Sequence, residues 1–332
     1  MMSKSELLDS CGRRINYVRL SITDRCNFRC VYCMPPDGET YIPHEEILSY
    51  EEILRLCRIM TDSGIEVFKI TGGEPLCRKG AVRFIRNLKA LPGVKQVTLT
   101  SNGVLLGPFV QELAQIGLDG LNISLDTLNQ RNFQTMSRTK ARPDQVIEAL
   151  DMARRAGLKV KINAVPMRDV NTADLEELAA FALSRGYTLR FIELMPMGPG
   201  MEYEGVGQEE IKRMLTDRFG ALAPLAERLG NGPAQYYRVE GYEGRVGFIS
   251  ALSDKFCASC NRVRLTSAGY LKSCLHHDIG IDLKKLLRCK ADDTALAAAI
   301  GETIRKKPAA HAFAPEQGKI IRSTFLMNSV GG

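Results

Sequence analysis

Hydrophobic and polar positions change their period several times along the first two thirds of the chain. Short apolar or alternating runs predict strands at 17–22, 65–71, 94–100, 120–125, 158–165 and 188–194. Between them, apolar residues at helical spacing predict helices near 81–91, 109–116, 143–156 and 173–185, and a capping box of Ser49 and Glu52 predicts a further helix start. Strands that alternate with helices indicate βα units on a parallel sheet. Six units are too few for a closed eight-stranded barrel, so a doubly wound sheet and an incomplete barrel both fit the pattern.

Residues that could bind a ligand or act in catalysis follow the predicted strands at their carboxyl ends. A cysteine-rich segment follows the first strand, and the next strands are followed by Gly72-Gly73-Glu74-Pro75, Ser101-Asn102-Gly103, Ser124 with Asp126, Asn163, and Glu193 with Met195. Parallel barrels build their active sites on that face. The pattern therefore predicts one mouth that is lined by every strand.

The alternation ends after Met195. Proline and glycine residues between 196 and 207 predict a loop, which is followed by a helix at 208–219 and hairpin-like segments at 235–240 and 245–249. We therefore expect a domain boundary near residue 225, with one domain at 1–225 and a smaller one at 226–332.

Composition narrows the class of protein. The 332 residues include ten cysteines, and 45 basic against 38 acidic residues give a net charge of +7. A chain of this size does not need disulfides for stability, its N-terminus lacks the apolar core of a signal peptide, and no apolar run approaches the roughly 20 residues of a membrane span. We expect a cytoplasmic protein without membrane contact, in which clustered cysteines bind metal or act in catalysis. The scattered positive charge suits an anionic ligand and gives no reason to expect nucleic acid as a partner.

Three cysteines directly after the first predicted strand have the spacing C-x3-C-x2-C: Cys26, Cys30 and Cys33. On a helix this spacing would form one apolar stripe, but Pro35-Pro36 would end such a helix at once. A metal or cluster site is the better interpretation. A cubane iron–sulfur cluster normally takes four thiolates. Three thiolates from one loop would leave one iron open to a reacting molecule, as catalytic zinc sites keep one position open.

A second group of three cysteines, Cys257, Cys260 and Cys274, has the spacing C-x2-C-x13-C. The segment between them predicts a hairpin that turns at Ala268-Gly269 and brings Cys274 back toward the pair. A structural zinc site completed by His276 or His277 and an iron–sulfur cluster fit this spacing equally well. The remaining cysteines are interpreted as ordinary core or surface residues.

The first triad, with Tyr32 just before its third cysteine, resembles the signature of the radical S-adenosylmethionine (SAM) enzymes. The flanking segments 19–24 and 33–35 are similar, more narrowly, to the GTP 3′,8-cyclases of molybdenum cofactor biosynthesis. This resemblance implies an α/β fold whose radical SAM core is an incomplete (β/α)6 TIM-type barrel, closed by a smaller C-terminal α+β domain. It also implies two [4Fe–4S] clusters, because the family carries the second triad at the same spacing and binds the guanine base of GTP at the open iron there.

The resemblance assigns ligand contacts residue by residue. It implies that the SAM contacts are Tyr32, Gly73, Ser124 and Met195. The implied GTP contacts are Arg19, Lys69, Thr100, Lys161, Arg262, Val263 and Arg264. From the residues alone, lysines inside strands are costly without a partner, and an anionic ligand would account for Lys69 and Lys161. The family more often has arginine where this chain has Lys69, which would remove a forked phosphate contact but keep the charge.

The chain ends in Gly331-Gly332, and the resembling family ends in two glycines that reach the active site. The resemblance therefore adds these two residues to the catalytic set of Cys26, Cys30, Cys33, Arg262 and Arg264. It implies that the reduced first cluster cleaves SAM to a 5′-deoxyadenosyl radical, which takes hydrogen from C3′ of GTP. The carbon radical would then attack C8 of guanine and give 3′,8-cyclo-7,8-dihydro-GTP.

The implied partners are an electron donor such as flavodoxin or ferredoxin, the next enzyme, cyclic pyranopterin monophosphate synthase, and a second copy of the chain in a homodimer. Two alternatives differ in class. One is a radical SAM enzyme that modifies a peptide or another nucleotide and uses the second cluster as an electron relay. The other is a zinc-stapled, basic RNA-binding protein without redox chemistry.

Overall fold

The computed structural model describes residues 6–38, 40–227, 229–313, 325 and 327–331 of the chain. Within these residues one twelve-stranded sheet runs in the order β12-β11-β10-β1-β2-β3-β4-β5-β6-β9-β8-β7. Its central six strands are β1 (Tyr17–Ser21), β2 (Val67–Thr71), β3 (Gln96–Ser101), β4 (Gly120–Ser124), β5 (Val160–Ala164) and β6 (Thr188–Ile192). The six predicted strands are confirmed, with ends that differ by at most two residues.

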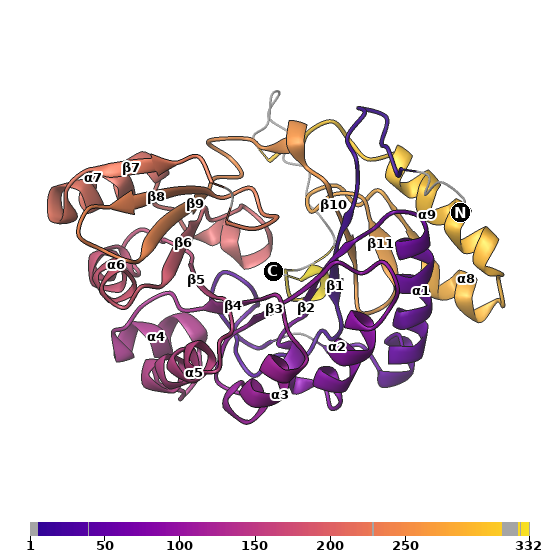
Figure 1. Ribbon diagram of the computed structural model, residues 1–332, viewed down its shortest axis with the longest axis horizontal. Helices are drawn as coiled ribbons and strands as arrows, with labels where there is room; N and C mark the ends of the chain where they lie inside the picture. Colours follow the sequence, from indigo (N-terminus) through magenta and orange to yellow (C-terminus); the bar gives the residue numbers. More distant parts are fainter. Residues whose placement is uncertain (1–5, 39, 228, 314–324, 326, 332) are drawn as a thin grey trace.

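Helices cover the outer side of these six strands (Figure 1). They are α1 (Tyr50–Asp62), α2 (Ala81–Lys89), α3 (Val110–Gln115), α4 (Gln130–Ser137), α5 (Pro143–Arg155) and α6 (Leu175–Ser184). The six strands are parallel and follow one another in chain order. A doubly wound sheet would reverse its strand order at a switch point. The incomplete (β/α)6 barrel is therefore the correct one of the two predicted architectures.

The C-terminal segment extends this sheet at both edges. On one side β9 (Arg245–Ile249) pairs with β6, and β8 (Gln235–Val239) and β7 (Leu222–Leu225) follow it. On the other side β10 (Arg262–Leu265) pairs with β1, and β11 (Tyr270–Lys272) and β12 (Gly280–Asp282) follow it. The remaining described helices are α7 (Gln208–Phe219), α8 (Leu283–Arg288), α9 (Asp293–Arg305) and α10 (Met327–Val330). The domain boundary near residue 225 stays a prediction.

Several local sequence signals explain where these elements begin and turn. The Ser49 hydroxyl accepts a hydrogen bond from the Glu52 amide (3.1 Å), and the Glu52 carboxylate accepts one from the Ser49 amide (2.7 Å). This confirms the predicted capping box at the start of α1. Gly269 lies between β10 and β11 and has a φ of +85°, a backbone conformation that glycine adopts without steric cost. The predicted hairpin at this point is therefore also confirmed.

Side chains of the central strands divide between two environments. On β2, Phe68 and Ile70 are fully buried and belong to the large hydrophobic core, while Lys69 and Thr71 point to the other side. The same alternation on β1 places Val18 and Leu20 in the core and leaves Arg19 on the inner side. The outer face of the sheet is therefore held by apolar packing against the helices, and the inner face is free to carry polar groups.

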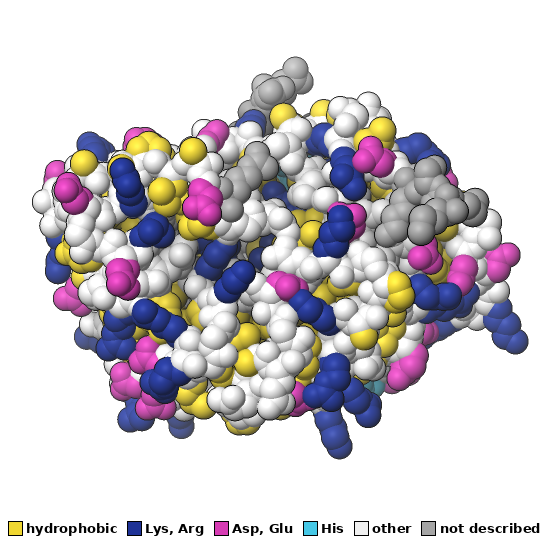
Figure 2. Space-filling model, in the orientation of Figure 1, with side chains coloured by type: hydrophobic (Ala, Val, Ile, Leu, Met, Phe, Trp, Pro, Cys, Tyr) yellow, Lys and Arg dark blue, Asp and Glu magenta, His cyan; other side chains and the backbone are white. Residues whose placement is uncertain are grey.

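The molecular surface shows no single basic patch on the face drawn in Figure 2. Lys and Arg side chains are spread over this face, with Asp and Glu side chains among them. A survey of the described helices finds none with the length and hydropathy that a membrane span requires.

Candidate active site

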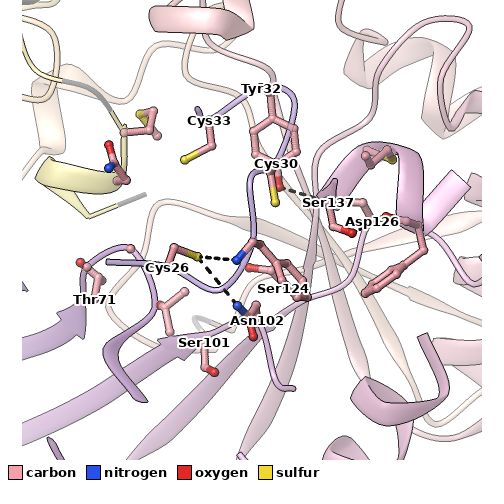
Figure 3. A pocket seen from close by; sticks show the side chains of 18 of the residues that line it. Cys26, Cys30, Tyr32, Cys33, Thr71, Ser101, Asn102, Ser124, Asp126 and Ser137 are labelled. Atoms are coloured by element: carbon pink, nitrogen blue, oxygen red, sulfur yellow. Dashed lines mark hydrogen bonds between the residues drawn. The ribbon is translucent and has the colours of Figure 1, made fainter. Parts of the chain in front are cut away.

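The first cysteine triad lines a cavity at the carboxyl ends of the barrel strands. Figure 3 shows the sulfur atoms of Cys26, Cys30 and Cys33 directed into the same space. The three residues lie on the loop after β1, and the Cys33 amide donates a hydrogen bond to the Cys30 carbonyl oxygen (2.8 Å), which tightens that loop. The amides of Phe28 (3.4 Å) and Asn102 (side chain, 4.0 Å) approach Cys26 Sγ.

Without a bound metal, the environment of these thiols favours the protonated form. Burial raises the pKa of Cys26 to about 12 and raises that of Cys30 well above its ordinary value. In Cys30 the neighbouring Cys33 and Asp126 act in the same direction. A buried thiolate needs a compensating positive charge, which the irons of a cluster supply when they displace the protons.

The arrangement of donors fits a cluster with one open iron. Three thiols from one loop face a shared cavity, and no fourth cysteine belongs to its lining. Among the described residues, no group of three His, Cys, Asp or Glu side chains converges on a point that one metal ion could occupy. The thiolates of a cubane bind separate irons and are spaced more widely than ligands of a single zinc ion.

Three of the four expected SAM contacts, Tyr32, Gly73 and Ser124, line the same cavity as the cysteines. The Tyr32 hydroxyl donates a hydrogen bond to the Asp126 carboxylate (2.9 Å), so the loop is tied to the end of β4. A Cβ atom at Gly73 would lie 2.5 Å from the Arg25 carbonyl oxygen, which explains the need for glycine there. Met195, the fourth expected contact, lies beyond β6 and is not part of the cavity lining.

Glu74 organises the turn that follows β2. Its buried carboxylate accepts hydrogen bonds from the amides of Leu76 (3.0 Å) and Asn102 (2.7 Å) and from the Ser101 hydroxyl. Burial outweighs these bonds and raises the pKa of Glu74 to about 7. The carboxylate therefore fixes the loops after β2 and β3 against each other beside the cavity, a role that the sequence analysis did not assign.

A second cavity lies toward the amino ends of the barrel strands, and its lining contains four basic side chains and two acidic ones, Asp119 and Glu227. Lys69, Lys161 and Arg190 line it, together with polar residues of neighbouring strands such as Thr98 and Asn122. Burial lowers the pKa of Lys69 well below its ordinary value, and the charges of Arg190, Arg19, Arg262 and Lys161 add to this effect. Burial also lowers the pKa of Lys161 to about 8. We call this cavity the basic basin.

Strand register places further cations beside the basic basin. Arg19 on β1 is paired with Lys69 on β2 on one side and with Arg264 on β10 on the other. Like charges directly opposite each other on neighbouring strands are destabilising. In the described part of the chain, no carboxylate forms an ion pair with Lys69, Lys161, Arg190, Arg262 or Arg264. An anionic ligand would relieve this repulsion.

Arg190 is a site residue that the sequence analysis missed. It lies in β6 between the buried residues Leu189 and Phe191. Its guanidinium donates two hydrogen bonds to the Asn163 side-chain carbonyl (2.9 and 2.6 Å) and one to the Asn122 side-chain carbonyl. The two asparagines hold the guanidinium inside the barrel. An arginine within an apolar strand run was the available signal, because it has the same unusual placement as Lys69 and Lys161.

The two cavities are stacked along the same strands. On β2, Lys69 lines the basic basin and Thr71 lines the cysteine cavity; on β4, Asn122 and Ser124 do the same. Two residues along a strand correspond to about 6.6 Å. Thr100, an expected GTP contact, lies on the cysteine side of this boundary. A ligand would fill both cavities if its anionic end and its reactive end were separated by about the length of one sugar ring.

The second cysteine triad lies at the edge of the barrel next to β1. Cys257 opens a single turn of 3-10 helix, Cys260 follows it, and Cys274 comes two residues after β11. Arg264 pairs with Lys272, so the hairpin register continues to place Cys274 opposite Arg262. Burial would raise the pKa of Cys260, but the charges of Lys307 and Arg262 outweigh it and the pKa is lowered.

His276 and His277, which the sequence suggests as possible zinc ligands, contact the segment around residues 310–313. The His276 ring is almost fully buried and packs edge-to-face against Phe313, with ring centroids 4.3 Å apart, while its Nδ1 accepts a hydrogen bond from the Ala312 amide. His277 Nε2 lies 3.1 Å from the Ala310 carbonyl oxygen. The described residues thus contain no preformed single-metal site at the second triad.

The C-terminal tail enters the barrel mouth. Helix α10 lies inside the curve of the sheet against β1 (Figure 1). Met327 and Asn328 line the cysteine cavity, and Arg264 donates a hydrogen bond to the Gly331 carbonyl oxygen (2.8 Å). Gly331 thus lies next to Arg264 and Thr71, and its role in the site stays a prediction, while Gly332 lies outside the described residues. Val263 is buried in the core, so only its backbone can face a ligand.

Comparisons with known proteins agree with this geometry. A family model described as Radical SAM superfamily matches residues 20–182, and one described as Molybdenum Cofactor Synthesis C matches residues 187–313. A GTP 3′,8-cyclase of Thermodesulfovibrio yellowstonii is 41% identical over 328 residues, which cover 98% of this chain and 99% of the relative. The chain belongs to the GTP 3′,8-cyclase family.

Other relatives and a solved structure support the same assignment. GTP 3′,8-cyclase 1 of Pseudomonas aeruginosa is 42% identical over 335 residues and covers 99% of this chain and 100% of the relative. The crystal structure of Streptococcus suis SuiB bound to S-adenosylmethionine has a TM-score of 0.61 at 17% identity, over 88% of this chain and 68% of SuiB. That likeness concerns the fold. Membership in this radical SAM family brings SAM and an iron–sulfur cluster with it, and it decides against the zinc-stapled RNA-binding alternative.

Proposed function

We propose that this protein is a GTP 3′,8-cyclase, which uses SAM and GTP to make 3′,8-cyclo-7,8-dihydro-GTP in the first step of molybdenum cofactor biosynthesis. The observation that carries the proposal is the stacking of a basic basin under a three-cysteine cavity on the same barrel strands. When bound, the first cluster and SAM supply the radical chemistry that removes a hydrogen atom from an unactivated carbon. The protein binds and orients the reactants and excludes water.

The basic basin binds the triphosphate. Lys69, Lys161 and Arg190 face it, and Arg19 stands beside Lys69 in the strand register. Arginine forks match phosphate oxygens in pairs, whereas a lysine acts as a point charge. Lys69 therefore contributes charge and one donor, while Arg19 and Arg190 fix the orientation of the phosphates.

The boundary between the two cavities holds the ribose. Thr71, Thr100 and Ser124 stand two residues further along their strands than the residues of the basic basin. A nucleotide whose phosphates lie in that basin has its sugar within reach of the cysteine cavity. This places C3′ next to the cavity in which Tyr32, Gly73, Ser124 and Met195 would hold SAM.

The second triad holds the other cluster. Cys257, Cys260 and Cys274 would hold this cluster, which would supply a binding position for the guanine base, while Arg262, Val263 and Arg264 contact the nucleotide. The register supports this because Arg264 is paired with Arg19 on β1, so β10 brings the second triad to the edge of the same mouth. The Gly331-Gly332 tail completes the site from the side of Arg264.

The remaining assignments follow from the reaction. The partners that we propose are a low-potential electron donor of the flavodoxin or ferredoxin kind, which would supply the electron, and cyclic pyranopterin monophosphate synthase, which would take the product. We also propose a homodimer, and a division of the chain near residue 225 into a radical SAM core and a C-terminal domain.

Anaerobic reconstitution tests the proposed function. Two cubane clusters predict about eight irons per chain, and added GTP should change the spectrum of the second cluster. With a strong reductant, the protein should form 5′-deoxyadenosine and a cyclised product. Arg264→Ala should lower cyclised product more than deoxyadenosine, because Arg264 lies on the strand beside the second triad and is not part of the lining of the cysteine cavity. Deoxyadenosine formation that is indifferent to GTP, with no cyclised nucleotide, would favour the peptide-modifying alternative.

A further inference from the structure

Two buried cations stand behind the second cysteine triad and have no place in the proposed chemistry. Lys307 follows α9 and is 3% exposed, although its neighbour Lys306 is on the surface. Arg13 lies in the N-terminal segment and is 9% exposed. The two come from opposite ends of the chain and meet at the loops that carry the three cysteines.

Both side chains bind backbone carbonyls next to the cysteines. Lys307 Nζ donates to the carbonyl oxygens of Arg262 (2.9 Å) and Ser273 (2.6 Å). The first acceptor is two residues after Cys260, and the second directly precedes Cys274. One ammonium group thus joins the two arms of the hairpin at the level where their cysteines meet.

Arg13 fixes the remaining cysteine in the same way. Its guanidinium donates to the Cys257 carbonyl oxygen (2.7 Å) and to those of Pro308 (2.6 Å) and Ala309 (2.9 Å). Residues 308 and 309 directly follow Lys307, so the two cations are coupled through the chain. Asp9 forms a buried ion pair with Arg13 at 2.5 Å and neutralises its charge.

Lys307 differs from Arg13 because no carboxylate among the described residues neutralises the charge of its ammonium group. Among the described residues, no carboxylate lies within ion-pairing distance of Lys307 Nζ, and its acceptors are neutral carbonyls. A buried charge without a counter-ion is strongly unfavourable. Three thiolates on an iron–sulfur cluster would provide negative charge at this place, since cysteine ligands are bound deprotonated.

We propose that Lys307 and Arg13 are positioning residues for the second cluster: they lock the three cysteine-bearing loops together through backbone carbonyls, and Lys307 balances the charge of the cluster. This inference rests on the proposed function, because it requires that the second triad holds a cluster. Partners behind the ligands commonly change metal affinity by about 10–100-fold. Loss of Lys307 should therefore weaken the second cluster selectively.

The experiment uses the full chain and measures iron retention. Lys307→Met and the matched surface variant Lys306→Met are reconstituted anaerobically, and their iron content and rate of iron release to a chelator such as EDTA are compared with those of the wild type. We expect Lys307→Met to keep about four irons firmly and to release the others at least about tenfold faster than the wild type. Lys306→Met should match the wild type, and Lys307→Arg should restore part of the retention because it keeps the charge.

The outcomes separate this inference from the proposed function. If the wild type holds about eight irons and Lys307→Met releases them at the wild-type rate, Lys307 has no positioning role and the inference is wrong, while the proposed function stands. If the wild type itself holds only about four irons, the second cluster and the inference both fall. Should Lys307→Met fail to fold, Arg13→Gln with Arg14→Gln as its exposed control provides the same comparison. Equal iron release by those two variants would overturn the inference.

Discussion

The guanidinium of Arg264 donates a hydrogen bond to the carbonyl oxygen of Gly331, with nitrogen and oxygen 2.8 Å apart. The bond joins β10, which is paired with β1, to the residue that directly follows α10, so two segments remote in the sequence meet at the barrel mouth. Gly331 has a φ of +76°, and a Cβ atom there would overlap the Thr71 side chain. Gly331 therefore allows the tail to pack against Thr71, and a side chain at this position would prevent that contact.

Gly331→Ala should unseat the tail. The left-handed conformation costs a non-glycine residue about 1–2 kcal/mol, and the overlap with Thr71 adds to that cost. We expect cyclised product to fall about tenfold or more, while deoxyadenosine formation falls less. Gly117→Ala is the matched control, because Gly117 has a φ of +71° with no atom within 4 Å of an added Cβ. Equal loss of product in both variants would show that backbone strain alone, and not the tail contact, explains the effect.

The first triad is tested by substitution of its members. Alanine at Cys26, Cys30 or Cys33 should abolish deoxyadenosine formation and remove about four irons per chain, because each thiol faces the same cavity. Cys289→Ala changes an exposed cysteine and should leave both quantities as in the wild type. Product chromatography and iron analysis give the two readouts. Deoxyadenosine formation that persists in any of the three variants contradicts the cluster assignment.

Lys69 is expected to show opposite effects on binding and on stability. Its buried charge lies among other cations, so Lys69→Met should raise the melting temperature of the ligand-free protein, by about 2 °C or more. The same change removes a charged contact to phosphate and should weaken GTP binding about 10–100-fold. Lys95→Met, at a largely exposed lysine, serves as the control. A variant that is less stable than the wild type and still binds GTP as tightly would contradict the role of the basic basin.

Asp126 should make stability depend on pH. Burial raises the pKa of this carboxyl to about 6, although hydrogen bonds from the Val165 amide and the Tyr32 hydroxyl act in the opposite direction. Since the pKa is raised on folding, the stabilising effect of the protonated form is present below the unfolded pKa of 3.8 and is lost as the pH rises through about 6.

Chemical unfolding of the cluster-free protein at pH 4 and pH 7 measures this effect. Relative to Asp126→Asn, the free energy of unfolding of the wild type should fall by about 1–3 kcal/mol over that range. Asp62→Asn, at an exposed position, should follow the wild type. A wild-type curve that rises with pH relative to Asp126→Asn would show that the hydrogen bonds, and not burial, control this carboxyl.

The barrel could be predicted from the sequence because each of its strands buries one apolar face against helices. Runs such as 65–71 and 188–194 stand out in the chain, and strong end signals such as Ser49 and Pro143 mark the helices. Helix α4 was missed, because only Phe133 and Met136 in its eight residues carry an apolar signal. Its start depends on Asn129, whose side chain caps the Asn132 amide, and asparagine is just as frequent in turns.

The candidate site could be predicted where cysteine spacing or glycine pairs mark it, and not where geometry alone creates it. Arg190 enters the basic basin only because β6 curves round beside Asn122 and Asn163. Lys307 and Arg13 are ordinary surface types in the sequence, and their burial depends on contacts between the two ends of the chain. Such contacts leave no periodic signal, so the structure was needed to find them.

Isotope transfer tests the central claim most directly. GTP carrying deuterium at C3′ is incubated anaerobically with the reconstituted protein, SAM and reductant, and the deoxyadenosine is analysed by mass spectrometry. If the basic basin holds the phosphates and the cysteine cavity holds SAM above the sugar, the deoxyadenosine gains one deuterium atom and a cyclised nucleotide forms with it. Deoxyadenosine that contains no deuterium, with GTP recovered unchanged, would contradict the account.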